Sequence, residues 1–159
     1  MGKPVHSLKS APSASQPEKP EALRAALEAA GCRYTQQRAA VYEYLSQVHS
    51  HPTAEDVYLA VRQSLTNISL ATVYKALEAL VAVGLANKLT YGDDAARYEF
   101  REHEHYHLRD VATGEVHDLA TPYDPDLLKK LDPRLRERLA AAGFEVTGYR
   151  LEVLGRFQS

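Results

Sequence analysis

Two histidines separated by one residue stand in a strand-like segment, and an aspartate follows eleven residues after the second. Side chains at positions i and i+2 of a strand leave the same face, so we expect His105 and His107 to point together. If residues 111–114 close a short hairpin, Asp118 lies directly opposite His107 and shares that face. Two imidazoles and a carboxylate suit iron, manganese or zinc better than calcium or magnesium, which prefer oxygen ligands. Surface histidines without a metal fit the spacing equally well.

The composition is that of an ordinary globular protein. Of the 159 residues 45% are hydrophobic and 25% charged, enough for one domain or two small ones. Because no apolar run approaches a membrane span and the N-terminus lacks the apolar core of a signal peptide, we expect a cytoplasmic protein with no membrane partner. Cys32 is the only cysteine, so any bound metal must be held by nitrogen and oxygen.

The first part of the chain has the pattern of a winged helix-turn-helix. Residues 1–20, rich in Ser, Pro, Ala and Lys, indicate a disordered tail. Apolar periodicity and end signals predict helices over 21–31, from Thr35, after a capping pattern at Thr53 and Asp56, and from Ser69 to Gly84. Two strand-like runs around a turn at 92–94 then predict a β-hairpin. In such an arrangement the helix from Ser69 is the recognition helix.

The second part alternates differently. Strands are expected at 104–110 and 115–119, helices at 125–131 and 133–142, and a last strand over 144–157. These elements predict a small α/β unit whose strands can pair across a dimer. The fold class is therefore α/β in the α+β sense, with a winged-helix domain at 21–92 and a metal-binding dimerisation domain at 93–159.

Charge alone does not indicate a nucleic-acid partner, because the formal net charge is −2 and tight non-specific DNA binders are usually more basic. A local face can still bind phosphates. In the helix from Ser69, a buried stripe of Val73, Leu77 and Leu80 leaves Tyr74 and Lys75 on the other side. The candidate DNA contacts are Ser69, Thr72, Tyr74 and Lys75, with Arg38 from the preceding helix reaching the backbone.

Several motifs in the same order carry a family resemblance. The segments RYTQQRAAVYEYL, HPTAEDVY, NISLATVYKAL, GLANKLTYGDDAARYEF and HYH resemble the ferric uptake regulator family of metal-dependent repressors, from about Gly31 to Arg156. Within the family, the run LTYGD at 89–93, the HYH segment and an aspartate at 118 are most similar to the peroxide-sensing branch.

The resemblance implies a homodimer that binds a palindromic operator when Fe(II) or Mn(II) occupies a regulatory site. Its ligands would come from both halves of the chain, so that the metal fixes the angle between them. It also implies that peroxide reacts at bound iron and oxidises His51 or His105, which releases the metal and the DNA. Carried over residue by residue, the ligand set is His51, Asp93, His105, His107 and Asp118.

The chain departs from the family where two Cys-x-x-Cys pairs usually bind structural zinc. Asp110 and Thr113 stand at the first pair and Phe157 where the second would begin, so a four-thiolate zinc site is excluded. Dimer stability must then come from strand pairing and from apolar residues such as Phe144, Val146, Leu151 and Val153.

Alternative functions and two unassigned histidines remain. The runner-up functions are a manganese, iron or zinc uptake regulator and a haem-responsive regulator of the same family. A His/carboxylate metalloenzyme is a competing class, but the sequence has no nucleophile motif, phosphate loop or HExxH, so we expect no enzyme. His103 and His117 are expected to be exposed, with His117 beside Leu108.

Overall fold

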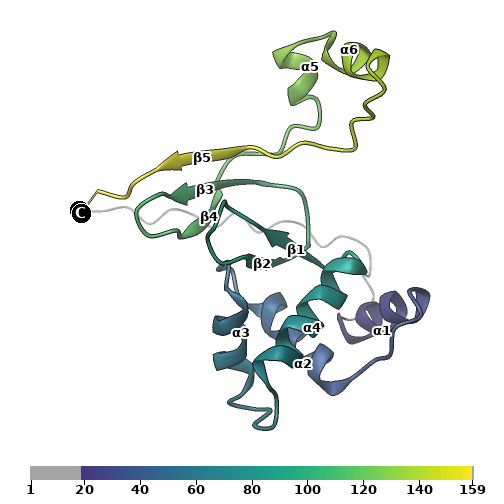
Figure 1. Ribbon diagram of the computed structural model, residues 1–159, viewed down its shortest axis with the longest axis vertical. Coiled ribbons are helices and arrows are strands. Elements are labelled where there is room, and N and C mark those ends of the chain that lie inside the picture. The colour runs from purple at the N-terminus through teal and green to yellow at the C-terminus, as the bar shows by residue number, and fades with distance from the viewer. Residues whose placement is uncertain (1–18, 159) are drawn as a thin grey trace, which may run out of the picture.

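The computed structural model describes residues 19–158, so most of the expected tail lies outside the described residues. Four helices come first, followed by a two-stranded hairpin (Figure 1): Lys19–Ala29 (α1), Gln36–Gln47 (α2), Ala54–Val61 (α3), Leu70–Ala82 (α4), Ala86–Leu89 (β1) and Arg97–Phe100 (β2). Lys19 and Pro20, which the sequence placed in the expected tail, belong to α1. Proline is well tolerated there because the first turn of a helix needs no amide donor.

Hydroxyl side chains fix the starts of three helices. Thr35 accepts a hydrogen bond from the amide of Arg38 at α2, and Ser69 accepts one from the amide of Thr72 at α4. The predicted capping box of Thr53 and Asp56 at α3 is confirmed, since each side chain bonds the other residue's amide. Such caps satisfy amides that have no partner within the helix.

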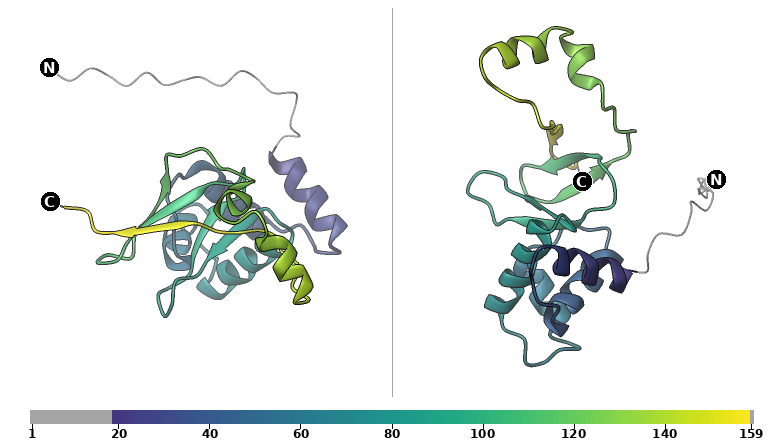
Figure 2. Two further views of the ribbon diagram at one scale, coloured as in Figure 1. Left: turned by 90° about the horizontal axis from the view of Figure 1, so that it is seen from above. Right: turned by 90° about the vertical axis from the view of Figure 1, so that its right-hand side faces the viewer.

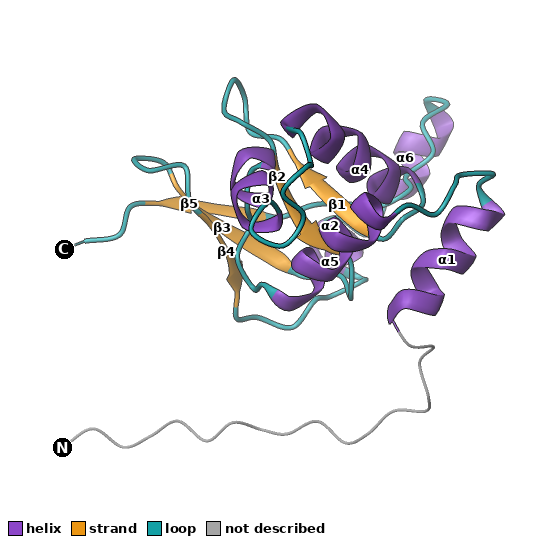
Figure 3. Ribbon diagram, turned by 90° about the horizontal axis from the view of Figure 1, so that it is seen from below, coloured by secondary structure: helices purple, strands orange, loops and turns teal. Residues whose placement is uncertain are grey.

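The core of the first half lies between the helices and the hairpin. Its residues include Leu27, Val41, Val57, Val73 and Leu77, all without exposed surface. Tyr98 of β2, 1% exposed, belongs to the same cluster, and in Figure 3 α1 lies at the rim of the helical group. The hairpin therefore packs with the helices as a wing. The expected domain boundary between residues 92 and 93 falls inside the turn of this hairpin.

The second half is built on a three-stranded sheet in the order β4-β3-β5. Its strands are Tyr106–Asp110 (β3), Val116–Leu119 (β4) and Glu152–Gly155 (β5). β3 and β4 are antiparallel with His107 opposite Asp118 and Leu108 opposite His117, which confirms the predicted register. Helices α5 (Leu127–Leu131) and α6 (Leu135–Ala141) lie beyond the sheet from α1–α4 (Figure 2).

The last strand is shorter than expected. It covers residues 152–155 and pairs in parallel with β3, whereas residues 144–151 do not form a strand. Alternation of apolar and polar residues can predict a strand, but only a hydrogen-bonded partner stabilises one. Phe144 and Val153 are 59% and 48% exposed in the single chain. No described helix is both long enough and apolar enough to cross a bilayer.

A buried carboxylate joins the β3–β4 turn to the C-terminal segment. Asp110 Oδ1 accepts hydrogen bonds from the amides of Ala112 (2.7 Å) and Thr113 (3.2 Å), and Oδ2 accepts one from the amide of Phe157 (3.1 Å). Asp110 and Phe157 stand at the positions where the resemblance places the first cysteine of each zinc-binding pair. The hydrogen bonds of the Asp110 carboxylate link these two segments directly.

Asp110→Ala is expected to lower the free energy of unfolding at neutral pH, because three amides lose their acceptor. The hydrogen bonds from Phe157 and Ala112 hold the pKa of Asp110 below its usual value. The stabilisation is therefore full above the unfolded-state pKa of about 3.9 and is lost as pH falls through the lower folded-state pKa. Urea unfolding in chelator, at a series of pH values, checks this.

The matched control is Asp126→Ala, at an exposed position where the side chain makes no cap hydrogen bond. Equal losses for both variants would contradict the role of Asp110.

Candidate metal centre

His51 is held at the start of α3 by contacts with the wing. Tyr98 donates its amide to the carbonyl of Pro52 (2.9 Å), and the Arg97 guanidinium donates to the carbonyl of His51 (3.0 Å). Thr53 and Arg97 form an isolated antiparallel bridge. The imidazole of His51 is buried. Strand β2 therefore fixes the backbone at His51 and at the two residues that follow it.

Glu99 lies on β2 and faces away from the helical core that Tyr98 enters. Asn87 of the neighbouring strand β1 lies directly opposite Glu99. The Asn87 amide nitrogen donates to Glu99 Oε1 at 2.9 Å. Only 6% of the surface of Glu99 is exposed. The hydrogen bond from Asn87 means that another residue of the wing orients this buried carboxylate.

The other candidate ligands come from the second half. His107 is on β3 and Asp118 lies opposite it on β4. His105 precedes β3, and its Nδ1 lies 2.9 Å from the carbonyl oxygen of His103. When Nδ1 donates a hydrogen bond to a carbonyl, the lone pair of Nε2 is available to bind a metal. This is the usual arrangement for a ligand histidine.

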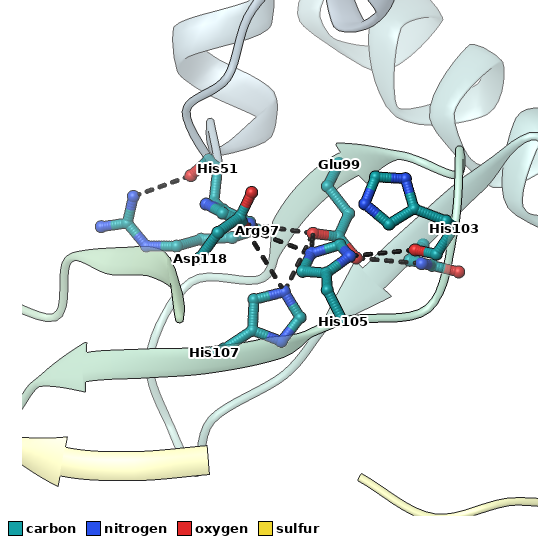
Figure 4. Close-up of polar contacts among 8 residues, drawn as sticks. His51, Arg97, Glu99, His103, His105, His107 and Asp118 are labelled. Carbon is teal, nitrogen blue, oxygen red and sulfur yellow. Dashed lines mark hydrogen bonds and ion pairs between the residues drawn. The ribbon is translucent and has the colours of Figure 1, made fainter. Parts of the chain in front are cut away.

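The five side chains converge on one point (Figure 4). Glu99 Oε2 lies 2.8, 3.1 and 3.0 Å from the Nε2 atoms of His51, His105 and His107. Asp118 Oδ1 lies 3.1 Å from Nε2 of both His51 and His105, and 4.0 Å from that of His107. One ligand atom from each residue lies within 4.8 Å of all the others. Ligands of a single metal at bonds of about 2.0–2.2 Å are separated by up to about twice that length, and the distances of 2.8–4.0 Å between carboxylate and imidazole atoms lie within that limit.

The charges also fit a divalent cation. With a metal bound, the two carboxylates and three neutral imidazoles would carry a charge of −2. Burial opposes ionisation of Glu99, but hydrogen bonds from His107, His51 and Asn87 outweigh it and hold the pKa of Glu99 far below its usual value. Burial lowers the pKa of His105, while the His103 carbonyl and the carboxylates of Glu99 and Asp118 raise it further than burial lowers it. The group is therefore an anionic, mostly buried site of nitrogen and oxygen donors, as transition metals prefer.

The structure brings together four of the five ligands expected from the sequence. His51, His105, His107 and Asp118 are in the group, whereas Asp93 is exposed in the β1–β2 turn and Glu99 stands as the fifth. The sequence contained a signal for Glu99. In the strand 97–100, the core position of Tyr98 places Glu99 on the opposite face, and it is the only carboxylate there.

The two histidines that the sequence left unassigned are exposed, as expected. His103 and His117 both lie at the surface. The ring of His117 contacts that of Phe157, with 5.2 Å between centroids, and its Nε2 lies 3.4 Å from Glu115. Neither histidine belongs to the five-residue group.

Helix α4 presents the face that the sequence predicted. Val73, Leu77 and Leu80 are fully buried, whereas Tyr74 is 42% exposed and Lys75 is exposed. At its start, the hydroxyls of Ser69 and Thr72 lie 2.8 Å apart and are engaged in the cap. The Arg38 guanidinium donates to the carbonyl of Arg33. The helix therefore offers Tyr74 and Lys75 to an external partner.

The sequence matches the model of the Ferric uptake regulator family over residues 29–154. It is 38% identical over 131 residues to the peroxide-responsive repressor PerR of Staphylococcus aureus, covering 82% of this chain and 84% of the relative.

The fold is similar to that of the Pseudomonas aeruginosa ferric uptake regulator determined with manganese, with a TM-score of 0.64, 27% identity, and 89% and 99% of the two chains covered. It is also similar to the Campylobacter jejuni peroxide stress regulator, with a TM-score of 0.58, 25% identity, and 89% and 98% covered. The chain belongs to the ferric uptake regulator family.

Proposed function

We propose that this protein is a metal-dependent transcriptional repressor that binds Fe(II) or Mn(II) at the five-residue group and responds to peroxide. The main support for this proposal is that the five ligands come from both halves of the chain. His51 and Glu99 belong to the helical half with its wing, and the other three belong to the sheet half. Similarity to the PerR repressor supports the peroxide response.

The five ligands join two bodies that the chain connects through residues 101–104 and that also meet where Leu89 and Tyr91 pack against Val116. When bound, the metal compensates the two carboxylates and, as Fe(II), supplies electrons to peroxide. His51 and Glu99 then set the position of the winged half relative to His105, His107 and Asp118. Without that link, the DNA-binding geometry becomes one of several arrangements.

We place the end of the DNA-binding unit after the β1–β2 hairpin, because Tyr98 packs in the helical core.

We propose that α4 is the recognition helix. Lys75 and Tyr74 would contact bases or phosphates, while Ser69, Thr72 and Arg38 would contact the DNA backbone. A homodimer would place two such helices in successive major grooves of palindromic double-stranded DNA. The exposed Phe144 and Val153 and the edge of β5 are the proposed dimer surface, with no four-thiolate zinc site. A repressor of this kind acts on DNA in the cytoplasm.

The test is operator binding with and without metal. A duplex selected from random sequence is titrated with protein in chelator and with Mn(II), and followed by fluorescence anisotropy. We expect chelation to weaken binding by roughly 10–100-fold, a typical coupling between two sites. Equal affinity in the two states would overturn the proposal.

Variants of exposed lysines separate DNA contact from metal binding in the same assay. Lys75→Ala should cost about 1–3 kcal/mol of operator binding and leave Mn(II) affinity unchanged. The matched control is Lys129→Ala, an exposed lysine on α5, which should change neither. If Lys75→Ala bound the operator normally, α4 would not be the recognition helix.

A further inference from the structure

The two oxygens of the Glu99 carboxylate have different surroundings. Oε2 faces the three imidazoles at 2.8–3.1 Å. Oε1 accepts the hydrogen bond from the Asn87 side chain at 2.9 Å. Because Asn87 and Glu99 are directly opposite on β1 and β2, the strand pairing itself sets this hydrogen bond.

The hydrogen bond restricts how Glu99 can bind a metal. A carboxylate can ligate through one oxygen or through both. For Glu99 to use both, its Oε1 must turn from Asn87 toward the imidazoles, and the half-buried Asn87 amide loses its acceptor. Leaving a shielded donor without a partner costs free energy, so the one-oxygen mode is favoured.

Space for a further ligand lies on the same side of the group. A cavity of about 390 Å³ is lined by Asn87, Glu99, His105, His107, Arg101 and Arg150, among others. It is large enough for water or a molecule the size of peroxide. Its wall contains both the amide that holds Glu99 and two of the ligand histidines, so a small molecule there reaches the metal position directly.

We propose that Asn87 is a positioning residue that limits Glu99 to one metal-binding oxygen and so keeps one coordination position open to a small ligand from this cavity. This inference rests on the proposed metal site. It adds that the hydrogen bond from Asn87 keeps the site accessible to peroxide. The protein supplies five ligand atoms, and iron, manganese and cobalt commonly accept six. If Glu99 bound through both oxygens, the sixth position would be filled by the protein.

The experiment uses Co(II) as the metal and azide as the small ligand. Full-length wild-type protein is loaded with Co(II), and azide is titrated while the visible absorption is recorded. The same titration is done with Asn87→Leu, which keeps a similar volume but cannot donate, and with Asn87→Ala as a second variant lacking the donor. Asn67→Leu makes the same change at an exposed loop position. Co(II) affinity is measured for every protein.

Azide should shift the spectrum of the wild type and of Asn67→Leu. In both Asn87 variants the azide dissociation constant should rise about tenfold, the value of one hydrogen bond, while Co(II) affinity stays equal or increases. Reduced Co(II) affinity with unchanged azide binding would show a merely structural role and overturn the inference. So would azide binding that is equal in all proteins, or a wild type that binds Co(II) but not azide. A wild type that does not bind Co(II) would overturn the proposed metal site as well.

Discussion

Glu99→Ala is expected to abolish the metal dependence of operator binding, whereas Asp93→Ala is expected to leave it intact. Glu99 Oε2 lies within 3.1 Å of the Nε2 atom of each of the three histidines, and Asp93 is exposed in the wing turn. Loss of a residue that only supports a ligand typically lowers metal affinity by about 10–100-fold, so loss of the ligand itself should exceed about 100-fold. Isothermal titration with Mn(II) and operator binding at a fixed Mn(II) concentration measure both effects.

The two variants also decide between two ligand sets. Urea unfolding in chelator shows whether each variant is folded, and only folded protein is compared. If Asp93→Ala lost the response while Glu99→Ala kept it, the set expected from the sequence would be correct. Glu99 would then be a hydrogen-bond partner of the three histidines and not a metal ligand.

Local signals made most of the fold predictable. Hydroxyl residues at Thr35, Thr53 and Ser69 mark helix starts, and the spacing of Val73, Leu77 and Leu80 marks a buried face. The hairpin register that places His107 opposite Asp118 followed from the length of one short turn. The length of β5 could not be predicted, because strand pairing depends on a distant partner, β3.

The fifth ligand illustrates a limit of motif matching. Asp93 lies in a run that resembles the family, but it is on the turn of the wing, whereas the metal position faces the strand that follows. Which face of β2 meets the second half depends on tertiary packing: Tyr98 enters the helical core and directs Glu99 outward. The role of Asn87 is likewise invisible in the sequence, because its hydrogen bond to Glu99 requires the cross-strand register.

Peroxide added to Fe(II)-loaded protein is expected to add one oxygen atom to His51 or His105, and to release the operator. The net change transfers one peroxide oxygen to the imidazole and leaves the other as water. Asp118 is the exposed ligand, with 56% of its side chain accessible, and its Oδ1 lies 3.1 Å from Nε2 of both histidines but 4.0 Å from that of His107. His105 lies beside Asp118 and also lines the cavity next to Asn87, so it should be modified most. Peptide mass spectrometry and operator binding, before and after peroxide, measure the two effects.

Three controls separate this reaction from other oxidations. Mn(II) reacts poorly with peroxide, so Mn(II)-loaded protein should keep both its histidines and its operator affinity. Cys32→Ser should respond like the wild type, because the only thiol is outside the metal group. Asp118→Glu should still bind the operator but respond less, since the longer side chain alters the open side of the group. Unmodified His51 and His105 in the Fe(II) sample, with operator binding unchanged, would identify the protein as a metal-uptake regulator, because its ligands would then report the presence of the metal and not its reaction.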